Sequence, residues 1–414
     1  MSIDLAQIRQ SFEKLKVIGQ NEAGGITRIS FSPEFRQAQV LISSFMETAG
    51  MEVEIDSIGN LIGTYAGRDQ SLLAVVSGSH LDTVLNGGAF DGALGIIAAV
   101  ECVRSWHEQN WRPLRTVQVI AFIEEEGTRF GTVCFGSRAM LGEFSEKNPE
   151  SFIDASGNSL LGFLKEMGLG EKPFSKDSFF QNGFCFIELH VEQGGILEQA
   201  GMAVGVVSAI VGISRLVLNI RGNANHAGTT SMELRQDALV AAASLISYIY
   251  NQALAAKGNY VATVGKLDVW PNAENVVPGE VRLTIEIRSE DVVRLEGVRK
   301  EIIGKLREIQ KDYKVNVDII TENQVPPIPM DDKVIHSICN IGKQLKITCK
   351  KMPSWAGHDA MIFAQHIPTG MIFVPSIGGI SHSPAEESDW DVIAKAAQLL
   401  EGTLKELASN SEDL

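Results

Sequence analysis

The sequence has few cysteines, no apolar run long enough to cross a membrane and no long block of charges of one sign. The cysteines are odd in number and form no C-x-x-C pair, a pattern typical of a reduced protein. They are Cys102, Cys134, Cys185, Cys339 and Cys349. We therefore expect a reduced, cytoplasmic protein.

The apolar segments predict neither a secretory signal nor a membrane span. Charged side chains interrupt the stretch Met1–Gly19, so it contains no continuous apolar region of the kind that a signal peptide needs. The most apolar long run, Ala238–Tyr250, is shorter than the roughly 20 residues that a span requires. We expect no membrane partner.

The charge balance argues against nucleic acid as a partner. The 414 residues include 36 basic and 51 acidic side chains, which gives a formal net charge of -15. Phosphate backbones and anionic lipid surfaces repel such a chain, although a local arginine or a metal ion can still bind an anionic substrate. The length suits two domains, and 44% hydrophobic residues supply a large core.

Two kinds of strand pattern divide the chain into two expected domains. Residues 1–212 and 328–414 contain short, almost continuous apolar runs between helices, which predict an α/β domain with a mostly parallel sheet. Residues 213–327 instead contain alternating strands and two long helices in the order β-α-β-β-α-β of ferredoxin-like domains. We expect this inserted α+β domain to leave Arg288 on the open, polar face of its sheet.

Imidazoles and carboxylates follow the apolar strands of the first domain. Asp91 precedes an apolar helix, of which we expect it to be the N-cap. Ligands bind at the edge of an α/β sheet where such strand ends meet. This donor set suits two divalent ions with a bridging carboxylate, and zinc readily takes both ligand types. The residues are His80, Asp91, Glu125, Glu126, His190 and His382.

The same residues resemble the dinuclear-metal aminoacylase/carboxypeptidase-like amidohydrolases. Within them the chain is most similar to the branch that cleaves N-carbamoyl groups, which includes allantoate amidohydrolases, N-carbamoyl-L-amino acid hydrolases and β-ureidopropionases. The resemblance covers nearly the whole chain. Its anchors are Gly78–Val84, Asn86–Gly92, Glu125–Phe130, Glu188–Gly194, His226–Thr230, Asn275–Gly279 and Ser381–Glu386.

The resemblance implies a role for each residue of the cluster. Asp91 would bridge two metal ions, and His80 and His190 would each belong to one centre or the other. Glu126 and His382 would complete the two centres. Glu125 would be the general base.

Further residues would support the metal ligands or play no part in catalysis. Asp82 would orient His80 through its second ring nitrogen. We expect Glu124 and Glu192 to be structural, whereas His358 could support a ligand or begin a helix. Nothing near Cys134 would lower its pKa, so we do not expect a nucleophile there.

The resemblance also implies a homodimer with a shared active site. In this family the residue at the position of His226 reaches the active site of the partner subunit and stabilises the tetrahedral oxyanion. Asn275 and Arg288 would bind the substrate from the inserted domain, with all three contributed across the interface. Gln193 would contact the substrate from the catalytic domain.

These observations predict a metal-dependent hydrolase of small ureido carboxylates. We favour allantoate, with release of ammonia and carbon dioxide, and keep N-carbamoyl-L-amino acids as the second candidate. A dipeptidase or an N-acyl-amino-acid deacylase is a further alternative, and a metal-stabilised dimeric scaffold without catalysis is the last. The ions would be Zn or Mn, although nitrogen and oxygen ligands also accept Co and Ni.

Overall fold

The computed structural model describes residues 3–170, 173–174, 180 and 183–412. The chain divides into two compact units. Unit 1 comprises Met1–Ser208 and Met330–Leu414, and unit 2 comprises Ala209–Pro329. These limits lie beside the boundaries at 213 and 327 that the strand patterns suggested.

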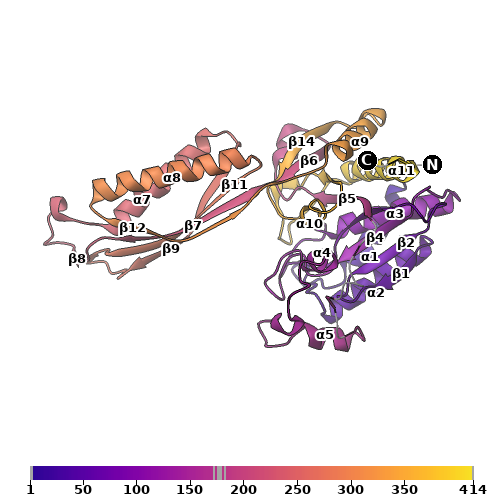
Figure 1. Cartoon of the computed structure of the whole chain (residues 1–414), viewed down its shortest axis with the longest axis horizontal. Coiled ribbons are helices and arrows are strands. Elements are labelled where there is room, and N and C mark those ends of the chain that lie inside the picture. Colours follow the sequence, from indigo (N-terminus) through magenta and orange to yellow (C-terminus); the bar gives the residue numbers. More distant parts are fainter. Residues whose placement is uncertain (1–2, 171–172, 175–179, 181–182, 413–414) are drawn as a thin grey trace. The chain divides into compact units, whose positions relative to one another are not determined.

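Unit 1 is built on a mixed sheet that is parallel in its centre and antiparallel toward its edges (Figure 1). The parallel strands, in spatial order, are β4 (Val117–Phe122), β3 (Ala74–His80), β5 (Gly183–Val191) and β15 (Thr369–Val374). The flanking strands are β1 (Glu52–Ile55), β2 (Leu61–Tyr65), β6 (Val204–Ile210), β13 (Ile328–Pro329) and β14 (Cys349–Ser354). The central strands are buried along almost their whole length, which explains their continuous apolar runs.

Helices pack against this sheet. α3 contacts β3 and β5, and α11 contacts β5 and β15, while α10 packs against β5 and β15. The helices of unit 1 are α1 (Leu5–Lys16), α2 (Pro33–Thr48), α3 (Ala93–Glu108), α4 (Phe135–Met140), α5 (Leu160–Glu166), α6 (Ile196–Ala200), α9 (Asp332–Gln344), α10 (Asp359–Phe363) and α11 (Trp390–Ser409). Short 3-10 turns are η1 (Pro149–Ser151) and η4 (Ile377–Gly379) in unit 1 and η3 (Met232–Leu234) in unit 2.

Unit 2 has the ferredoxin-like arrangement expected from its element order (Figure 1). Its antiparallel sheet has the order β12-β7-β11-β9, and α7 and α8 pack on one face of it. A short ladder of β8 and β10 accompanies this sheet. The elements are β7 (Gly212–Arg221), β8 (Asn225–His226), α7 (Ala238–Ala255), β9 (Val261–Trp270), β10 (Val276–Val277), β11 (Glu280–Ser289), α8 (Val292–Tyr313) and β12 (Asn316–Val325). The fold class predicted from the sequence is confirmed.

Strict alternation along β11 explains which face of the unit 2 sheet is covered. Val281, Leu283, Ile285 and Ile287 are fully buried against the helices. Successive residues of a strand point to opposite faces, so Arg288 lies on the polar face with Glu286.

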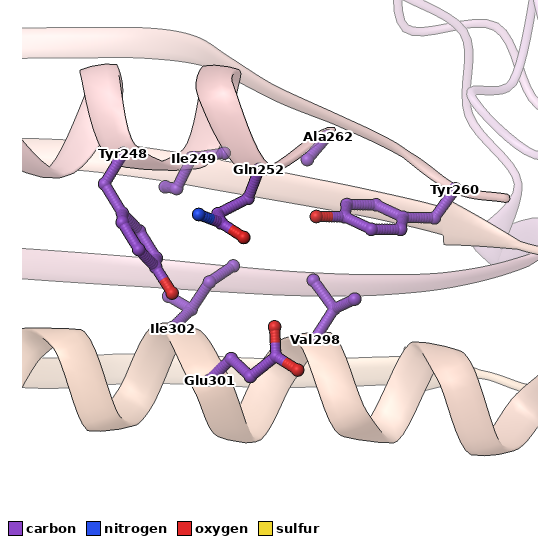
Figure 2. Close-up of a pocket in the computed structure, with 8 residues that line it drawn as sticks. All are labelled: Tyr248, Ile249, Gln252, Tyr260, Ala262, Val298, Glu301 and Ile302. Carbon is purple, nitrogen blue, oxygen red and sulfur yellow. The ribbon is translucent and has the colours of Figure 1, made fainter. Parts of the chain in front are cut away.

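A small cavity lies in the interior between α7 and α8 and is shown in Figure 2. The side chains of Tyr248, Gln252, Tyr260 and Glu301 face it with their polar atoms. Its volume of about 10 Å³ is close to the space that one water molecule needs. The cavity is therefore too small to be a substrate site.

Among the described residues one helix, α7, is long and apolar enough by length and composition to cross a membrane. Ala238, Ala241, Leu245 and Ile249 of this helix are buried in the core of unit 2. Packing of this kind is the ordinary role of an apolar helix inside a domain, so the helix is weak evidence for a span.

Two details of the strand ends differ from expectation. β3 and β5 continue through His80 and His190, so both histidines belong to the strands themselves. α3 begins at Ala93 with Gly92 at the N-cap, and Asp91 is not the cap. The predicted N-cap was wrong because the Asp91 carboxylate turns toward the histidines instead.

A close approach between α3 and the sheet gives a testable prediction for stability. A Cβ on Gly95 would lie 2.2 Å from the carbonyl oxygen of Leu189 and 2.9 Å from the Ser79 Cβ. We expect Gly95→Ala to lower the free energy of unfolding by about 1–3 kcal/mol, because the helix must move off the strands. Chemical denaturation measures the change.

The matched control is a helical glycine with open surroundings. A Cβ on Gly297 in α8 would meet no heavy atom of the described residues within 4 Å. Gly297→Ala should therefore raise the free energy of unfolding by about 0.5–1 kcal/mol through helix propensity alone. Equal stabilisation by both substitutions would contradict the close packing of α3.

Candidate metal centre

All five residues expected to bind metal meet at one edge of the unit 1 sheet. His80 and His190 end the adjacent parallel strands β3 and β5. Glu126 follows β4, and His382 lies in the segment between β15 and α11. Asp91 stands between them, just before α3. The carboxyl ends of parallel strands thus deliver the donors, as the sheet geometry predicts.

The two oxygens of Asp91 divide the cluster into two halves. Oδ1 lies 3.2 Å from Nε2 of both His80 and His190, and we call these three groups the first half-site. Oδ2 lies 3.3 Å from His382 Nε2, and His382 Nε2 lies 3.5 Å from Glu126 Oε1. We call Asp91 Oδ2, His382 and Glu126 the second half-site. The sequence left open which histidine belongs to which half, and the geometry pairs His80 with His190.

Hydrogen bonds fix the ring nitrogens of the first half-site. His80 Nδ1 lies 3.0 Å from the carbonyl oxygen of Asp82, and His190 Nδ1 lies 2.9 Å from that of Val191. A carbonyl only accepts, so each Nδ1 carries the proton and each Nε2 presents a lone pair. The two Nε2 atoms are 3.4 Å apart and face Asp91 Oδ1, which is buried without a hydrogen bond from the described residues. Three facing lone pairs fit a bound cation.

The pKa shifts point to the same need for positive charge. Burial alone would lower the pKa of His80, but the nearby carboxylates of Asp91, Glu125 and Asp82 raise it well above its usual value. Contact with Asp91 raises the pKa of His382 to about 9. Burial would raise the pKa of Asp91, yet the three histidines around it hold that pKa well below the usual range. The carboxylates around the histidines therefore favour positive charge at this cluster, which a proton or a cation could supply.

A buried carboxylate holds the turn that presents the glutamates. The Asp82 side chain accepts hydrogen bonds from the backbone N–H groups of Glu125 at 3.0 Å and Glu126 at 3.2 Å. Its carboxylate is 3.9 Å from His80 Nδ1, so the backbone carbonyl of Asp82, and not the side chain, orients that ring. Asp82 was expected behind His80, but its carboxylate instead holds the glutamate turn.

Glu124 has a structural role at the same turn. Its backbone is left-handed, with φ of 57°. Its carboxylate accepts hydrogen bonds of 2.7 Å from the N–H groups of Arg129 and Phe130. The structural role predicted for Glu124 is confirmed, and its strained backbone turns the chain sharply after β4.

Glu125 is buried beside the first half-site. Its Oε2 is 3.8 Å from His80 Nε2, and its Oε1 accepts a hydrogen bond from the Cys134 thiol at 3.3 Å. Burial and then the neighbouring Asp359 and Glu126 charges raise the pKa of Glu125 well above its usual value, although His80 opposes this. Burial also raises the pKa of Cys134 well above its usual range. Cys134 is therefore a thiol donor, in agreement with the prediction that it is not a nucleophile.

Glu386 supports the centre, and the sequence analysis gave it no role. Its Oε1 accepts hydrogen bonds from the backbone N–H groups of Phe90 at 2.7 Å and Asp91 at 3.0 Å. The Ser381 hydroxyl lies 2.8 Å from the other oxygen of Glu386 and 3.1 Å from Asp91 Oδ2, so its single proton is shared between the two carboxylates. The segment that carries His382 thereby holds the backbone and side chain of Asp91. The only sequence signal was the position of Glu386 in the Ser381–Glu386 motif.

Two residues that follow β5, Glu192 and Gln193, have different roles: Glu192 holds the backbone, and Gln193 contacts the donor cluster. Glu192 accepts hydrogen bonds from the N–H groups of Ile196 at 2.7 Å and Leu197 at 2.9 Å, so it holds the start of α6 as expected. Gln193 has left-handed backbone, with φ of 59°. Its amide Nε2 lies 2.7 Å from Asp91 Oδ2 and 3.2 Å from His382 Nε2. Gln193 thus reaches the second half-site.

His358 packs directly behind a ligand. Its ring lies 4.4 Å from that of His190, and its Nε2 is 3.0 Å from the Ser354 hydroxyl. It precedes α10 at the N-cap position but makes no capping hydrogen bond. Of the two roles left open by the sequence, the structure favours support of the ligand.

The three residues expected from unit 2 occupy two separate places in that unit. His226 in β8 pairs with Val276 in β10, and the carbonyl of Asn275 accepts from the N–H of Ala227. Both side chains are exposed. Arg288 lies near the end of β11, and Glu280 lies at its start. The two residues are about 27 Å apart along the extended strand. The Arg288 guanidinium forms an ion pair with Glu286. The structure does not bring Arg288 to the other two residues.

Comparisons with known proteins agree with this geometry. The pattern of Peptidase family M20/M25/M40 matches residues 76–406. Allantoate amidohydrolase of Escherichia coli is 37% identical to this chain, and the match covers 98% of this chain and 99% of that protein. N-carbamoyl-L-amino acid amidohydrolase of Geobacillus stearothermophilus is 38% identical, and the match covers 96% of this chain and 97% of that protein. The crystal structure of a putative amidohydrolase/peptidase from Burkholderia cenocepacia superposes with a TM-score of 0.93 at 30% sequence identity, and the match covers 99% of this chain and 100% of that one.

These relatives confirm the prediction of an enzyme that hydrolyses carbon–nitrogen bonds. Metal dependence is general in the matched family, and the clustered donors fit it. By sequence, fold and donor set alike, the chain belongs to Peptidase family M20/M25/M40.

Proposed function

We propose that this protein is a two-metal amidohydrolase that cleaves the carbamoyl carbon–nitrogen bond of a small ureido carboxylate. The observation that carries the proposal is the shared Asp91 carboxylate, which faces two histidines through one oxygen and His382 through the other. Allantoate is the favoured substrate, and N-carbamoyl-L-amino acids are the second candidate. Similar relatives carry both names, which supports the class and leaves the choice to experiment.

The donors suit divalent zinc or manganese, with His80, His190 and Asp91 holding one ion and Asp91, Glu126 and His382 the other. When bound, two such ions supply Lewis acidity and lower the pKa of water. Glu125 takes the proton of the attacking water and passes it to the leaving nitrogen. Burial raises the pKa of Glu125 well above its usual value, and a neighbouring cation would favour the ionised form that acts as a base.

His226 is suited to donate a hydrogen bond to the developing oxyanion. Its Nδ1 accepts from the backbone N–H groups of Gly228 at 3.0 Å and Thr229 at 3.3 Å. The proton of the neutral ring therefore sits on Nε2, on an exposed side chain. An N–H donor aimed at an oxyanion typically contributes about 10²–10³ in kcat.

The separation of Arg288 from His226 supports a shared site in a homodimer. Arg288 pairs with Ile213 of β7, beside the residues where the chain enters unit 2. The strand β8, which contains His226, lies beyond the other end of β11 (Figure 1), and the carbonyl of Asn275 accepts from Ala227 next to it. One copy of unit 2 therefore cannot place all three around one small substrate, whereas two copies can. In this arrangement Arg288 comes from the same chain as the metal donors and binds the substrate carboxylate through its planar fork, whereas His226 and Asn275 come from the partner. This differs from the expectation that all three residues are contributed across the interface.

The first prediction of the proposed function concerns the general base. We expect Glu125→Gln to lower kcat by about 10²–10⁴-fold, because the amide cannot accept the proton of the water. Bound metal, measured by elemental analysis after desalting, should stay at the wild-type level. The exposed residue Glu146 supplies the control Glu146→Gln, which should keep full activity. Full turnover by Glu125→Gln would remove Glu125 from the mechanism.

The second prediction tests the shared site. Co-expressed Glu125→Gln and His226→Ala chains should form heterodimers with one intact site, and equal mixing should restore about a quarter of wild-type activity. The control pair, Glu125→Gln with Glu126→Gln, damages two residues of the same unit and should restore none. No recovery in the first pair would show that His226 does not act across subunits.

The third prediction separates the candidate substrates. A panel of allantoate, N-carbamoyl-L-amino acids, N-acetyl-L-amino acids and dipeptides is assayed for product amine at fixed metal content. We expect kcat/KM for the best ureido compound to exceed that for the acetyl compounds and dipeptides by at least about tenfold. Faster dipeptide or N-acetyl cleavage would favour the alternative function, and no turnover of any compound would favour a non-catalytic scaffold.

A further inference from the structure

The two half-sites differ in one respect that the sequence did not predict. In the first half-site, three acceptor atoms face one another and Asp91 Oδ1 receives no hydrogen bond from the described residues. In the second half-site, the amide of Gln193 already supplies an N–H donor to Asp91 Oδ2 at 2.7 Å. The first half-site receives one N–H group, from the backbone of Gly92 to His190 Nε2 at 3.3 Å. The Gln193 amide lies closer to its acceptor and approaches two donor atoms of the second half-site, so the second half-site is the more strongly occupied.

The position of this amide conflicts with a bound cation. Gln193 Nε2 lies near both Asp91 Oδ2 and His382 Nε2, which are two of the donors that would hold the second ion. An amide nitrogen has no free lone pair and cannot act as a ligand in that position. The Nε2 atom of a neutral imidazole has one lone pair, which cannot accept a hydrogen bond and bind an ion at once. An ion bound to His382 Nε2 therefore competes with the Gln193 amide for that lone pair.

The local structure holds Gln193 in this position at some cost. The left-handed backbone is uncommon for a residue with a side chain. The backbone N–H of Gln193 donates to the Ser376 hydroxyl at 3.1 Å, which fixes the turn before Gly194 and Gly195. Gln193 Oε1 is buried without a hydrogen bond from the described residues. The hydrogen bond to Asp91 Oδ2 offsets the cost of the left-handed backbone and of the buried Oε1. The same hydrogen bond would compete with a metal ion for the Asp91 carboxylate.

We propose that the Gln193 amide occupies the second half-site until an ion displaces it, so that the two ions bind with unequal affinity. The first half-site binds the tighter ion. Binding of the second ion releases the amide, which becomes available to the substrate only in the fully loaded centre. This inference rests on the proposed function, because it takes the two half-sites to be metal sites.

The test is a titration of the metal-free, full-length protein with Co²⁺, followed by calorimetry and by the visible absorption of the bound ion. Wild type should bind two ions with distinct dissociation constants. His382→Ala should lose the weaker ion and keep the tighter one, which assigns the weaker ion to the second half-site. Gln193→Ala should lower the weaker dissociation constant by about 10-fold to 100-fold, because a hydrogen bond to a charged group no longer competes.

A matched control uses another glutamine of the same segment. Gln199 is exposed in α6, and Gln199→Ala should leave both dissociation constants unchanged. If wild type binds two ions and Gln193→Ala leaves the weaker constant unchanged or raises it, the inference falls and the proposed function stands. Two ions of equal affinity in wild type would also overturn the inference alone. Failure of wild type to bind two ions would overturn the inference and the proposed function together.

Discussion

The Asp91 carboxylate is the group on which the rest of the centre depends. It is buried, and its two oxygens face His80 and His190 on one side and His382 on the other. Asp82, Glu125 and Glu126 lie close by, so several acidic groups share a poorly solvated space. Charges of one sign in such a space are costly unless cations or protons compensate them. The donor arrangement is best understood as preparation for cations.

The loops around the centre are held by carboxylates that bind backbone N–H groups. Asp82 holds the glutamate turn, and Glu386 holds Phe90 and Asp91. Behind Asp82, the buried guanidinium of Arg28 donates to the carbonyl of Leu81, and burial lowers its pKa to about 10 against the opposing charge of Asp82. These contacts hold the loops that carry Asp91, Glu125 and Glu126, in the way that hydrogen-bonded neighbours orient the ligands of metal sites in general.

The sequence predicted the parts of the centre that follow from strand periodicity and residue chemistry. Apolar runs located the strand ends, and the edge of an α/β sheet then brought His80, His190 and Glu126 together. The predicted cap at Asp91 failed because an aspartate before a helix can either cap it or bind elsewhere, and only the fold decides. The contacts of Gln193 and Glu386 depend on loop backbone angles and on partners far along the chain, so no local pattern reveals them.

The distribution of groups between the units separates two kinds of chemistry. Every group assigned to metal binding and proton transfer belongs to unit 1. The exposed His226 and the polar-face Arg288 belong to unit 2, where they sit at different ends of the sheet. Under the proposed function, metal affinity depends on unit 1 and oxyanion stabilisation on unit 2, whereas the substrate is contacted by Gln193 of unit 1 and by Asn275 and Arg288 of unit 2. Unit 2 supplies none of the donor atoms proposed to bind metal. A substitution in unit 2 that changed metal affinity would therefore act indirectly, by shifting the structure of unit 1, and not by altering a metal ligand.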